Sequence, residues 1–318
     1  MKHTVKITLI LMSMFLITQL IGLFVIQVYN DKAHFVELPY GTEPPPEVQD
    51  DVSILSLLIS FVIAISIFIL LMKLNAETFI RIWFFVVISL AVALALYAIF
   101  VKFNIFSIDT LYISIIAMVI SIPLAYIKIF KRNILVHNIT ELLIYPGIAA
   151  VFIPILNIMG IIILLLLISL YDIWAVWHTS FMQSMAKYQI NNLKIFGGFF
   201  VPYADKKSKL KIKQIKEKYQ NKSDKFMESK FKEAKVKVNL AILGGGDVVF
   251  PIITAGVFYK ITGSLTSSLI ITAFATIALL VLFTMARKGK FYPAMPFLTI
   301  GLYLGMIVDW ILISLHII

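Results

Sequence analysis

The chain has 318 residues, of which 60% are hydrophobic and only 14% are charged, and its mean hydropathy is +0.96. A soluble domain could not bury so much apolar surface, so the composition indicates a polytopic protein embedded in a lipid bilayer. The net charge of +11 is concentrated between the apolar runs, and the absence of cysteine excludes disulfides, thiol catalysis and cysteine-based metal sites.

Nine apolar runs are long enough to cross a hydrocarbon core as helices of about 20 residues. In chain order they cover residues 7–28, 52–72, 80–100, 110–128, 134–156, 158–181, 238–260, 265–285 and 293–315. A short turn near residues 157–160 separates the fifth run from the sixth. The first run follows Lys2 and Lys6 but is too long for a signal peptide and lacks a small-residue cleavage site. The sequence therefore predicts an all-α membrane protein with nine transmembrane helices.

The lysines and arginines predict the orientation of these helices, because basic residues favour the cytoplasmic side. With the amino terminus inside, 25 of the 28 basic residues fall inside, and only Lys32, Lys102 and Lys260 fall outside. A miscounted helix would scramble this alternation. We therefore expect a multi-pass plasma-membrane protein with a cytoplasmic amino terminus and an external carboxyl terminus.

One large polar segment, residues 185–237, separates six amino-terminal helices in residues 1–184 from the last three in residues 238–318. Residues 205–237 contain thirteen lysines against five acidic residues, an excess of eight positive charges. Few aromatic residues are interleaved for base stacking, so we expect no nucleic-acid partner. The pattern predicts a solvated cytoplasmic loop near anionic headgroups.

Four acidic residues lie within predicted spans, where an ionisable side chain is a functional candidate. At 1.5 Å per residue, Asp247 lies about 15 Å along its helix from Lys237. Asp172, on a helix that enters from outside, stops about 8 Å short of the inner face of the core. The two aspartates therefore reach similar depth on helices of opposite direction, and we expect them to face each other.

The other two acids, Glu141 and Asp309, have alternative explanations. Glu141 lies at a comparable depth and can pair with Arg132 or His137, which favours a structural role over a part in the chemistry. Asp309 lies near the outer end of its helix beside Trp310, where we expect it to cap or anchor that end.

Three local patterns accompany the aspartates at the inner ends of the helices. They are Tyr171-Asp172, Gly244-Gly245-Gly246-Asp247 and Pro293-Ala294-Met295-Pro296. A tyrosine hydroxyl can hydrogen-bond a carboxylate or a substrate carbonyl. Glycines allow another chain to approach closely, and the two prolines disrupt a regular first helical turn and expose main-chain groups.

These patterns resemble the signatures of the presenilin and signal peptide peptidase family. Tyr171-Asp172 is similar to the family's YD motif on the sixth helix, and Gly244 to Asp247 resemble its GxGD motif on the seventh. Pro293-Ala294-Met295 resembles the PAL motif on the ninth, with methionine in place of leucine. All three motifs occur in order in the carboxyl-terminal half, whereas the first five helices match only in number and layout.

The resemblance implies a presenilin-like fold and an intramembrane aspartyl protease with Asp172 and Asp247 as its catalytic pair. Such a pair holds one proton, so the ionised member activates water while the protonated member supports the substrate carbonyl. This mechanism needs no metal and no cofactor. The implied partners are transmembrane helices of other proteins, which must unwind locally before cleavage.

A proton-coupled secondary transporter is the main alternative, because such proteins also place acids on helices interrupted by glycine or proline. Transporters often contain internal repeats, and no second copy of the glycine–aspartate or proline pattern occurs here. An ion channel would need a chain of polar residues that these spans lack. The protease interpretation is therefore favoured.

Overall fold

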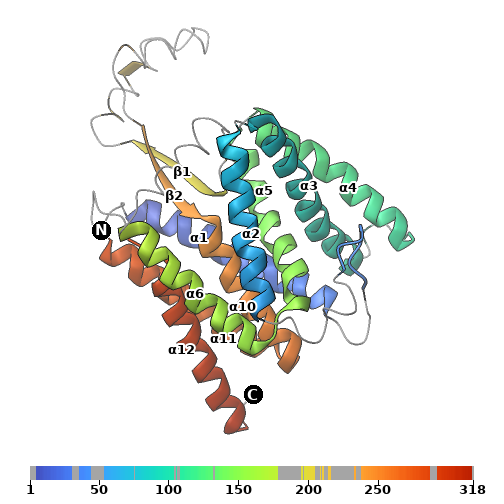
Figure 1. The fold of residues 1–318 in the computed structure, drawn as a ribbon, viewed down its shortest axis with the longest axis vertical. Coiled ribbons are helices and arrows are strands. Elements are labelled where there is room, and N and C mark those ends of the chain that lie inside the picture. Colours follow the sequence, from blue (N-terminus) through green and yellow to red (C-terminus); the bar gives the residue numbers. More distant parts are fainter. Residues whose placement is uncertain are drawn as a thin grey trace.

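The computed structural model describes residues 5–30, 36–43, 54–74, 76–103, 108–131, 133–177, 197–204, 238–286 and 292–316, with a few single positions between them. Its elements are α1 (Val5–Tyr29), α2 (Ile54–Lys73), α3 (Glu77–Lys102), α4 (Thr110–Tyr126), the π-helix η2 (Ile127–Lys131), α5 (Ile134–Phe152), the 3-10 helix η3 (Ile153–Ile155), α6 (Ile158–Trp177), β1 (Gly198–Ala204), β2 (Val238–Gly244), α10 (Gly245–Thr262), α11 (Leu265–Met285) and α12 (Met295–Ser314). Figure 1 shows α3 and α4 on one side of the bundle and α6, α11 and α12 on the other, with β1 and β2 at one end.

The apolar runs predicted most of these helices to within a few residues. The turn between α5 and α6 is closed by Asn157, whose side-chain oxygen accepts a hydrogen bond from the Gly160 N–H at 2.7 Å. Seven of the helices in the described ranges are long and apolar enough to cross a membrane, and α2 and α10 are not among them. The protein is thus a helical, multi-pass membrane protein, while nine spans remain a prediction.

Small residues allow these apolar helices to pack closely, as in other membrane bundles. A Cβ atom on Gly147 of α5 would lie 1.9 Å from the main-chain oxygen of Ala91 in α3. On α12, a Cβ on Gly301 would come within 2.5 Å of the Ala278 side chain of α11, and a Cβ on Gly305 would come within 3.1 Å of the Ile271 Cα. The bundle core therefore depends on backbone-to-backbone contact.

The predicted seventh span, residues 238–260, is wrong at its start. Residues Val238–Gly244 form strand β2, and the helix α10 begins only at Gly245. The partner strand β1 lies within the segment predicted to be a solvated loop. The depth assigned to Asp247 from a continuous helix is therefore also wrong, because that residue lies in the first turn of α10.

The two strands pair antiparallel, with Gly198 opposite Gly244 and Ala204 opposite Val238. Pro202, opposite Leu240, has no N–H to donate, so this position is a pair without ladder hydrogen bonds. Hydrogen-bonded and non-hydrogen-bonded pairs alternate along an antiparallel ladder, so residues 200 and 198 are also in non-hydrogen-bonded pairs. Their main-chain groups point away from β2, toward the outer edge of β1.

Candidate active site

Asp172 lies on the buried face of α6 and is only 8% exposed. Its Oδ2 accepts a hydrogen bond from the main-chain N–H of Met295 at 3.1 Å. Met295 is the first residue of α12 and Pro296 follows it. The first N–H groups of a helix have no partner within the helix, and its positive dipole end favours an anion. The start of α12 is therefore a matched site for the Asp172 carboxylate.

Polar contacts along α6 and α12 fix this alignment. The hydroxyls of Ser169 and Thr299 lie 2.6 Å apart, and Thr299 also donates to the Leu165 carbonyl at 3.3 Å. One turn further, the Tyr303 hydroxyl donates to the Ile162 carbonyl at 2.6 Å. These contacts join two antiparallel helices at successive turns, so they determine which residue of α12 faces Asp172.

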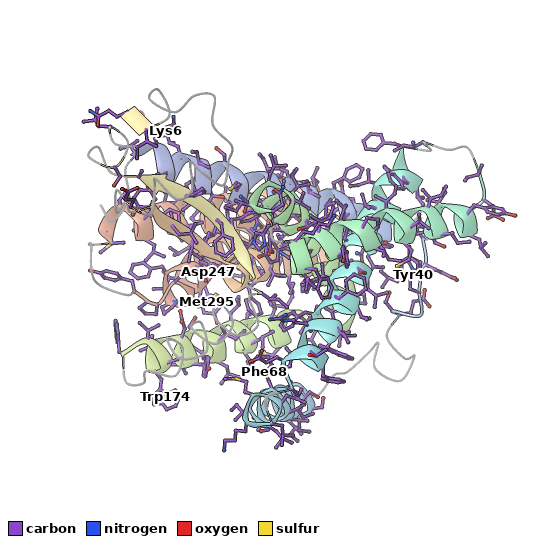
Figure 2. All side chains as sticks on the ribbon, turned by 90° about the horizontal axis from the view of Figure 1, so that it is seen from above. Lys6, Tyr40, Phe68, Trp174, Asp247 and Met295 are labelled. Carbon is purple, nitrogen blue, oxygen red and sulfur yellow. The ribbon has the colours of Figure 1, made fainter. Side chains whose placement is uncertain are left out.

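Asp247 occupies the third position of α10, directly after the strand β2. Its carboxylate folds back on Gly244, where a Cβ atom would lie 3.1 Å from Oδ2. Ala294 lines the same cavity as Asp247, and the next residue, Met295, binds Asp172, so both carboxylates adjoin the start of α12. Figure 2 shows Asp247 and Met295 side by side, with Trp174 on the opposite side of α6. The start of α10 and the start of α12 thus bring both aspartates to one place.

The three glycines before Asp247 are not equivalent. A Cβ on Gly245 would lie 2.8 Å from the hydroxyl oxygen of Tyr145 and 2.9 Å from its Cε1, whereas a Cβ on Gly246 would meet nothing closer than 3.8 Å. Close approach of α5 therefore requires glycine at position 245 but not at position 246.

A cavity of about 130 Å³ adjoins Asp247. It is lined by β2, by the end of α11 and by the segment before α12, which includes Tyr292 and Ala294. A buried water needs about 10–15 Å³ of such volume and two to four polar partners. The cavity therefore has room for several water molecules beside the Asp247 carboxylate.

The remaining predicted site residues take different positions. Tyr171 is half-buried, and its ring packs near Trp174 with centroids 6.4 Å apart. In the described ranges its hydroxyl makes no hydrogen bond to Asp172, so the predicted contact is not seen. Pro293 is buried beside the half-buried Ala294 and Pro296.

Glu141 and Asp309 lie outside this site. Glu141 forms a buried ion pair with Lys128 and also contacts His137, as expected for a structural role, although Lys128 was not among its predicted partners. Asp309 is 0% exposed, so the prediction of an interfacial anchor is wrong. Neither of its carboxylate oxygens has a hydrogen-bond partner among the described residues.

Sequence reasoning missed Tyr145, Ser169 and Thr299. Tyr145 follows Glu141 by four residues, which places both on one face of α5. Thr299 follows Met295 by four residues on α12 in the same way. This spacing was the available signal. In the described ranges, no three His, Asp or Glu side chains gather in a group that could hold a metal ion.

Comparisons with known proteins identify the family and the fold. The family model "Signal-peptide peptidase, presenilin aspartyl protease" matches residues 12–315. Two solved structures of a presenilin family intramembrane aspartate protease, in C222 and P2 space groups, superimpose with TM-scores of 0.55 and 0.57 at 15% and 17% identity. They cover 94% and 95% of this chain, and the matches extend over 94% and 96% of theirs.

No curated protein matches the chain. None of the matches supports the transporter alternative. At such low identity the solved structures establish the fold alone, whereas the family model covers nearly the whole sequence. The chain belongs to the signal-peptide peptidase and presenilin family of aspartyl proteases.

Proposed function

We propose that the chain is an intramembrane aspartic endopeptidase in which Asp172 and Asp247 form the catalytic pair. The observation that carries the proposal is that both carboxylates adjoin the start of α12. Asp172 of α6 accepts from the Met295 N–H, and Asp247 of α10 lines, together with Ala294, a cavity large enough for water. Membership in an aspartyl protease family supports the same chemistry.

Two carboxylates in an apolar interior cannot both ionise cheaply, so the pair holds one proton between them. The ionised carboxylate takes a proton from a water molecule in the cavity as that water attacks the substrate carbonyl carbon. The protonated carboxylate donates a hydrogen bond to the carbonyl oxygen as charge develops there. The Met295 N–H supports the ionised form of Asp172 and keeps its second oxygen oriented.

The substrate is a transmembrane helix that unwinds where it enters the site. The outer edge of β2 is free of a third strand in the described ranges, and β2 leads directly into Asp247. By the alternation described above, residues 240, 242 and 244 point main-chain groups toward that edge. An unwound substrate segment adds there as a strand, which delivers its peptide bond to the aspartates. The basic loop and the amino terminus lie in the cytoplasm.

The decisive experiment is cleavage of a labelled single-span peptide by the purified protein in detergent. Asp172→Asn and Asp247→Asn should each lower kcat by about 10²- to 10⁴-fold, because each removes one proton-transfer partner. Asp309→Asn is the matched control: it also replaces a buried aspartate in a predicted span, but one on the far end of α12, and it should retain cleavage.

Products mapped inside the span, made by wild type and by Asp309→Asn but by neither site variant, would support the proposal. Equal cleavage by all four proteins would refute the assignment of the pair. If wild type cut only the extramembrane ends of the peptide, the intramembrane mechanism would be wrong.

A further inference from the structure

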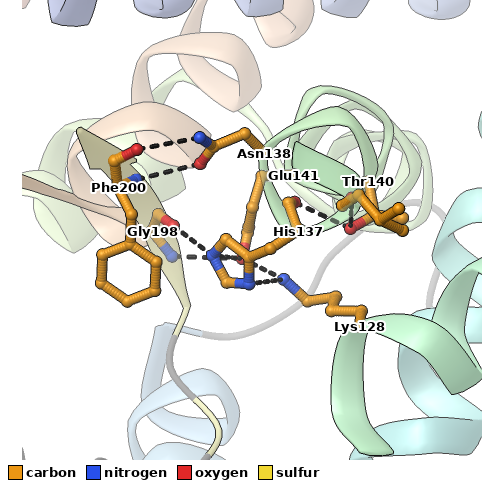
Figure 3. Close-up of polar contacts among 8 residues, drawn as sticks. Lys128, His137, Asn138, Thr140, Glu141, Gly198 and Phe200 are labelled. Carbon is orange, nitrogen blue, oxygen red and sulfur yellow. Dashed lines mark hydrogen bonds and ion pairs between the residues drawn. The ribbon is translucent and has the colours of Figure 1, made fainter. Parts of the chain in front are cut away.

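One face of α5 carries a column of polar residues that the catalytic pair does not use. His137, Glu141 and Tyr145 are spaced four residues apart, so they lie one above another along the helix. All three are buried, with Glu141 only 1% exposed. Figure 3 shows His137 and Glu141 of this column facing β1.

Glu141 is the centre of a buried ionic contact. Its Oε1 meets the ammonium of Lys128, which the π-helix η2 delivers from the end of α4, and the two side chains are 1% and 3% exposed. The Lys128 Nζ also lies 3.1 Å from His137 Nδ1. Removing either partner of such a pair leaves a buried charge without compensation, which destabilises a protein strongly. The pair therefore holds η2 and α5 together as a unit.

The same group binds the main chain of β1. His137 Nε2 lies 2.7 Å from the Gly198 carbonyl oxygen, and the Gly198 N–H donates to Glu141 Oε1 at 3.3 Å. The imidazole therefore donates from Nε2 to Gly198 and accepts at Nδ1 from Lys128. Gly198 has a φ of 144°, which L side chains rarely adopt, so glycine permits both of its main-chain groups to face α5.

Asn138 makes a similar contact with β1 two residues further along the strand, at Phe200. Its Nδ2 donates to the Phe200 carbonyl at 2.8 Å, and its Oδ1 accepts from the Phe200 N–H at 3.0 Å. Residues 198 and 200 are those whose main-chain groups point away from β2. The side chains of α5 therefore occupy the place of a third strand along the outer edge of β1.

This attachment reaches the site through the sheet. Gly198 is paired with Gly244, the residue from which α10 and Asp247 follow. Tyr145, at the far end of the column, contacts Gly245 directly, and its ring packs edge-on against Phe199 with centroids 5.8 Å apart. One end of the column, at His137 and Glu141, thus holds Gly244 through Gly198, and the other end, at Tyr145, packs against Gly245.

We propose that Glu141, His137 and Asn138 are positioning residues that fix β1 and, through β1 and β2, hold Asp247 and the substrate-pairing edge in register. The inference rests on the proposed function for its catalytic consequence. Its structural core, the coupling of α5 to residues 238–246, can be measured without any cleavage.

The test compares Asn138→Ala with Asn133→Ala. Asn133 caps α5 through bonds to the N–H groups of Leu135 and Val136 and contacts neither strand through them, so its loss weakens α5 without releasing β1. Amide hydrogen exchange of the full-length protein in detergent is followed in residues 198–204 and 238–246. Asn138→Ala removes two hydrogen bonds, so exchange in both segments should accelerate by about tenfold or more, whereas Asn133→Ala should leave both near wild type.

A second variant tests the charges while retaining a side chain that can bind Gly198. Glu141→Gln alone would leave Lys128 buried and unpaired, so it is combined with Lys128→Met. The double variant should keep the protection of residues 198–204, because a glutamine oxygen still accepts from Gly198. In Asn138→Ala, kcat for cleavage should fall about tenfold with little change in KM, because the strand edge remains but Asp247 is less well held.

Faster exchange confined to residues 198–204 would refute the coupling, and so would equal effects of the two asparagine variants. An inert wild type that still shows coupled exchange would overturn the proposed function but leave the positioning role intact. An active wild type whose Asn138→Ala variant matches it in both exchange and kcat would overturn the positioning role alone.

Discussion

Gly245 and Gly246 are adjacent residues in the first turn of α10, yet alanine should have opposite effects at the two positions. In either place alanine gains helix propensity, worth up to about 0.5–1 kcal/mol relative to glycine and less in a first turn. At position 246 the new Cβ has ordinary contacts, the nearest being Phe250 at 3.8 Å. Gly246→Ala should therefore be neutral or slightly stabilising.

At position 245 the new Cβ would lie 2.8 Å and 2.9 Å from two atoms of Tyr145. The Tyr145 ring is 4% exposed and is backed by Phe199, so it cannot retreat without disturbing β1. Overpacking of this kind costs about 1–3 kcal/mol, which outweighs the gain in helix propensity. The displaced helix start also carries Asp247, two residues on, and a shift of about 1 Å can lower a rate by about 10²-fold.

Thermal unfolding in detergent and cleavage kinetics of both variants check this expectation. Gly245→Ala should unfold at a lower temperature than Gly246→Ala and should lose most of its kcat. Adding Tyr145→Phe to Gly245→Ala should restore part of the loss, because it removes the hydroxyl contact but leaves Cε1 in place. Indistinguishable Gly245 and Gly246 variants would show that α5 does not pack against the start of α10 as described.

Two further predictions concern regions away from the aspartates. Gly147→Ala should lower the free energy of unfolding by about 3 kcal/mol, because the obstacle is the main chain of α3 rather than a mobile side chain. Gly197→Ala is the control, because nothing lies within 4 Å of the Cβ that it would add. Similar unfolding midpoints for the two variants would contradict the packing of α5 against α3. In the loop after α1, Tyr40 donates a hydrogen bond to the Ser114 carbonyl at 2.6 Å, and burial, followed by the neighbouring Tyr97, raises the pKa of the Tyr40 hydroxyl to about 12. The protonated phenol is the form that folding favours, so its contribution to stability is complete below the ordinary pKa of 10 and declines between pH 10 and about 12. Tyr40→Phe should therefore flatten the fall of the unfolding temperature in that range, and an unchanged pH profile would refute this assignment.

The sequence predicted the helices well because each is a long, continuous apolar run whose length is set by the bilayer. The start of α10 was missed for a physical reason. Residues 238–244 are apolar in either conformation, and their pairing partner lies more than thirty residues away in a segment dominated by lysine. Local periodicity carries no information about such a distant pairing. The Phe, Val and Tyr content of residues 198–204 was the only local sign of a strand.

In the site, too, some features could be predicted from the sequence and others depend on tertiary contacts. The sequence predicted that Asp172 and Asp247 face each other because they lie on helices of opposite direction, although the depth assigned to Asp247 was wrong because strand β2 was missed. From the two prolines, Pro293 and Pro296, the sequence predicted only that main-chain groups are exposed at the start of this helix. That the Met295 N–H is the group that donates to Asp172 depends on the alignment of α6 with α12. Lys128 could not be assigned to Glu141, because its reach depends on the wider turn of η2. The missed groups are therefore those whose positions follow from tertiary contacts.

The pairing of Ala204 with Val238 means that the chain leaves the sheet and returns to it at adjacent points. For a segment whose ends are already held together, the entropic cost of added length grows only logarithmically, by about 0.6 kcal/mol for each doubling. Residues 205–237 can therefore change in length at little entropic cost while the strand that leads into Asp247 stays anchored. A folded domain with neighbouring termini could be inserted there as a reporter, so this part of the sequence can vary in length under selection separate from that acting on the two aspartates.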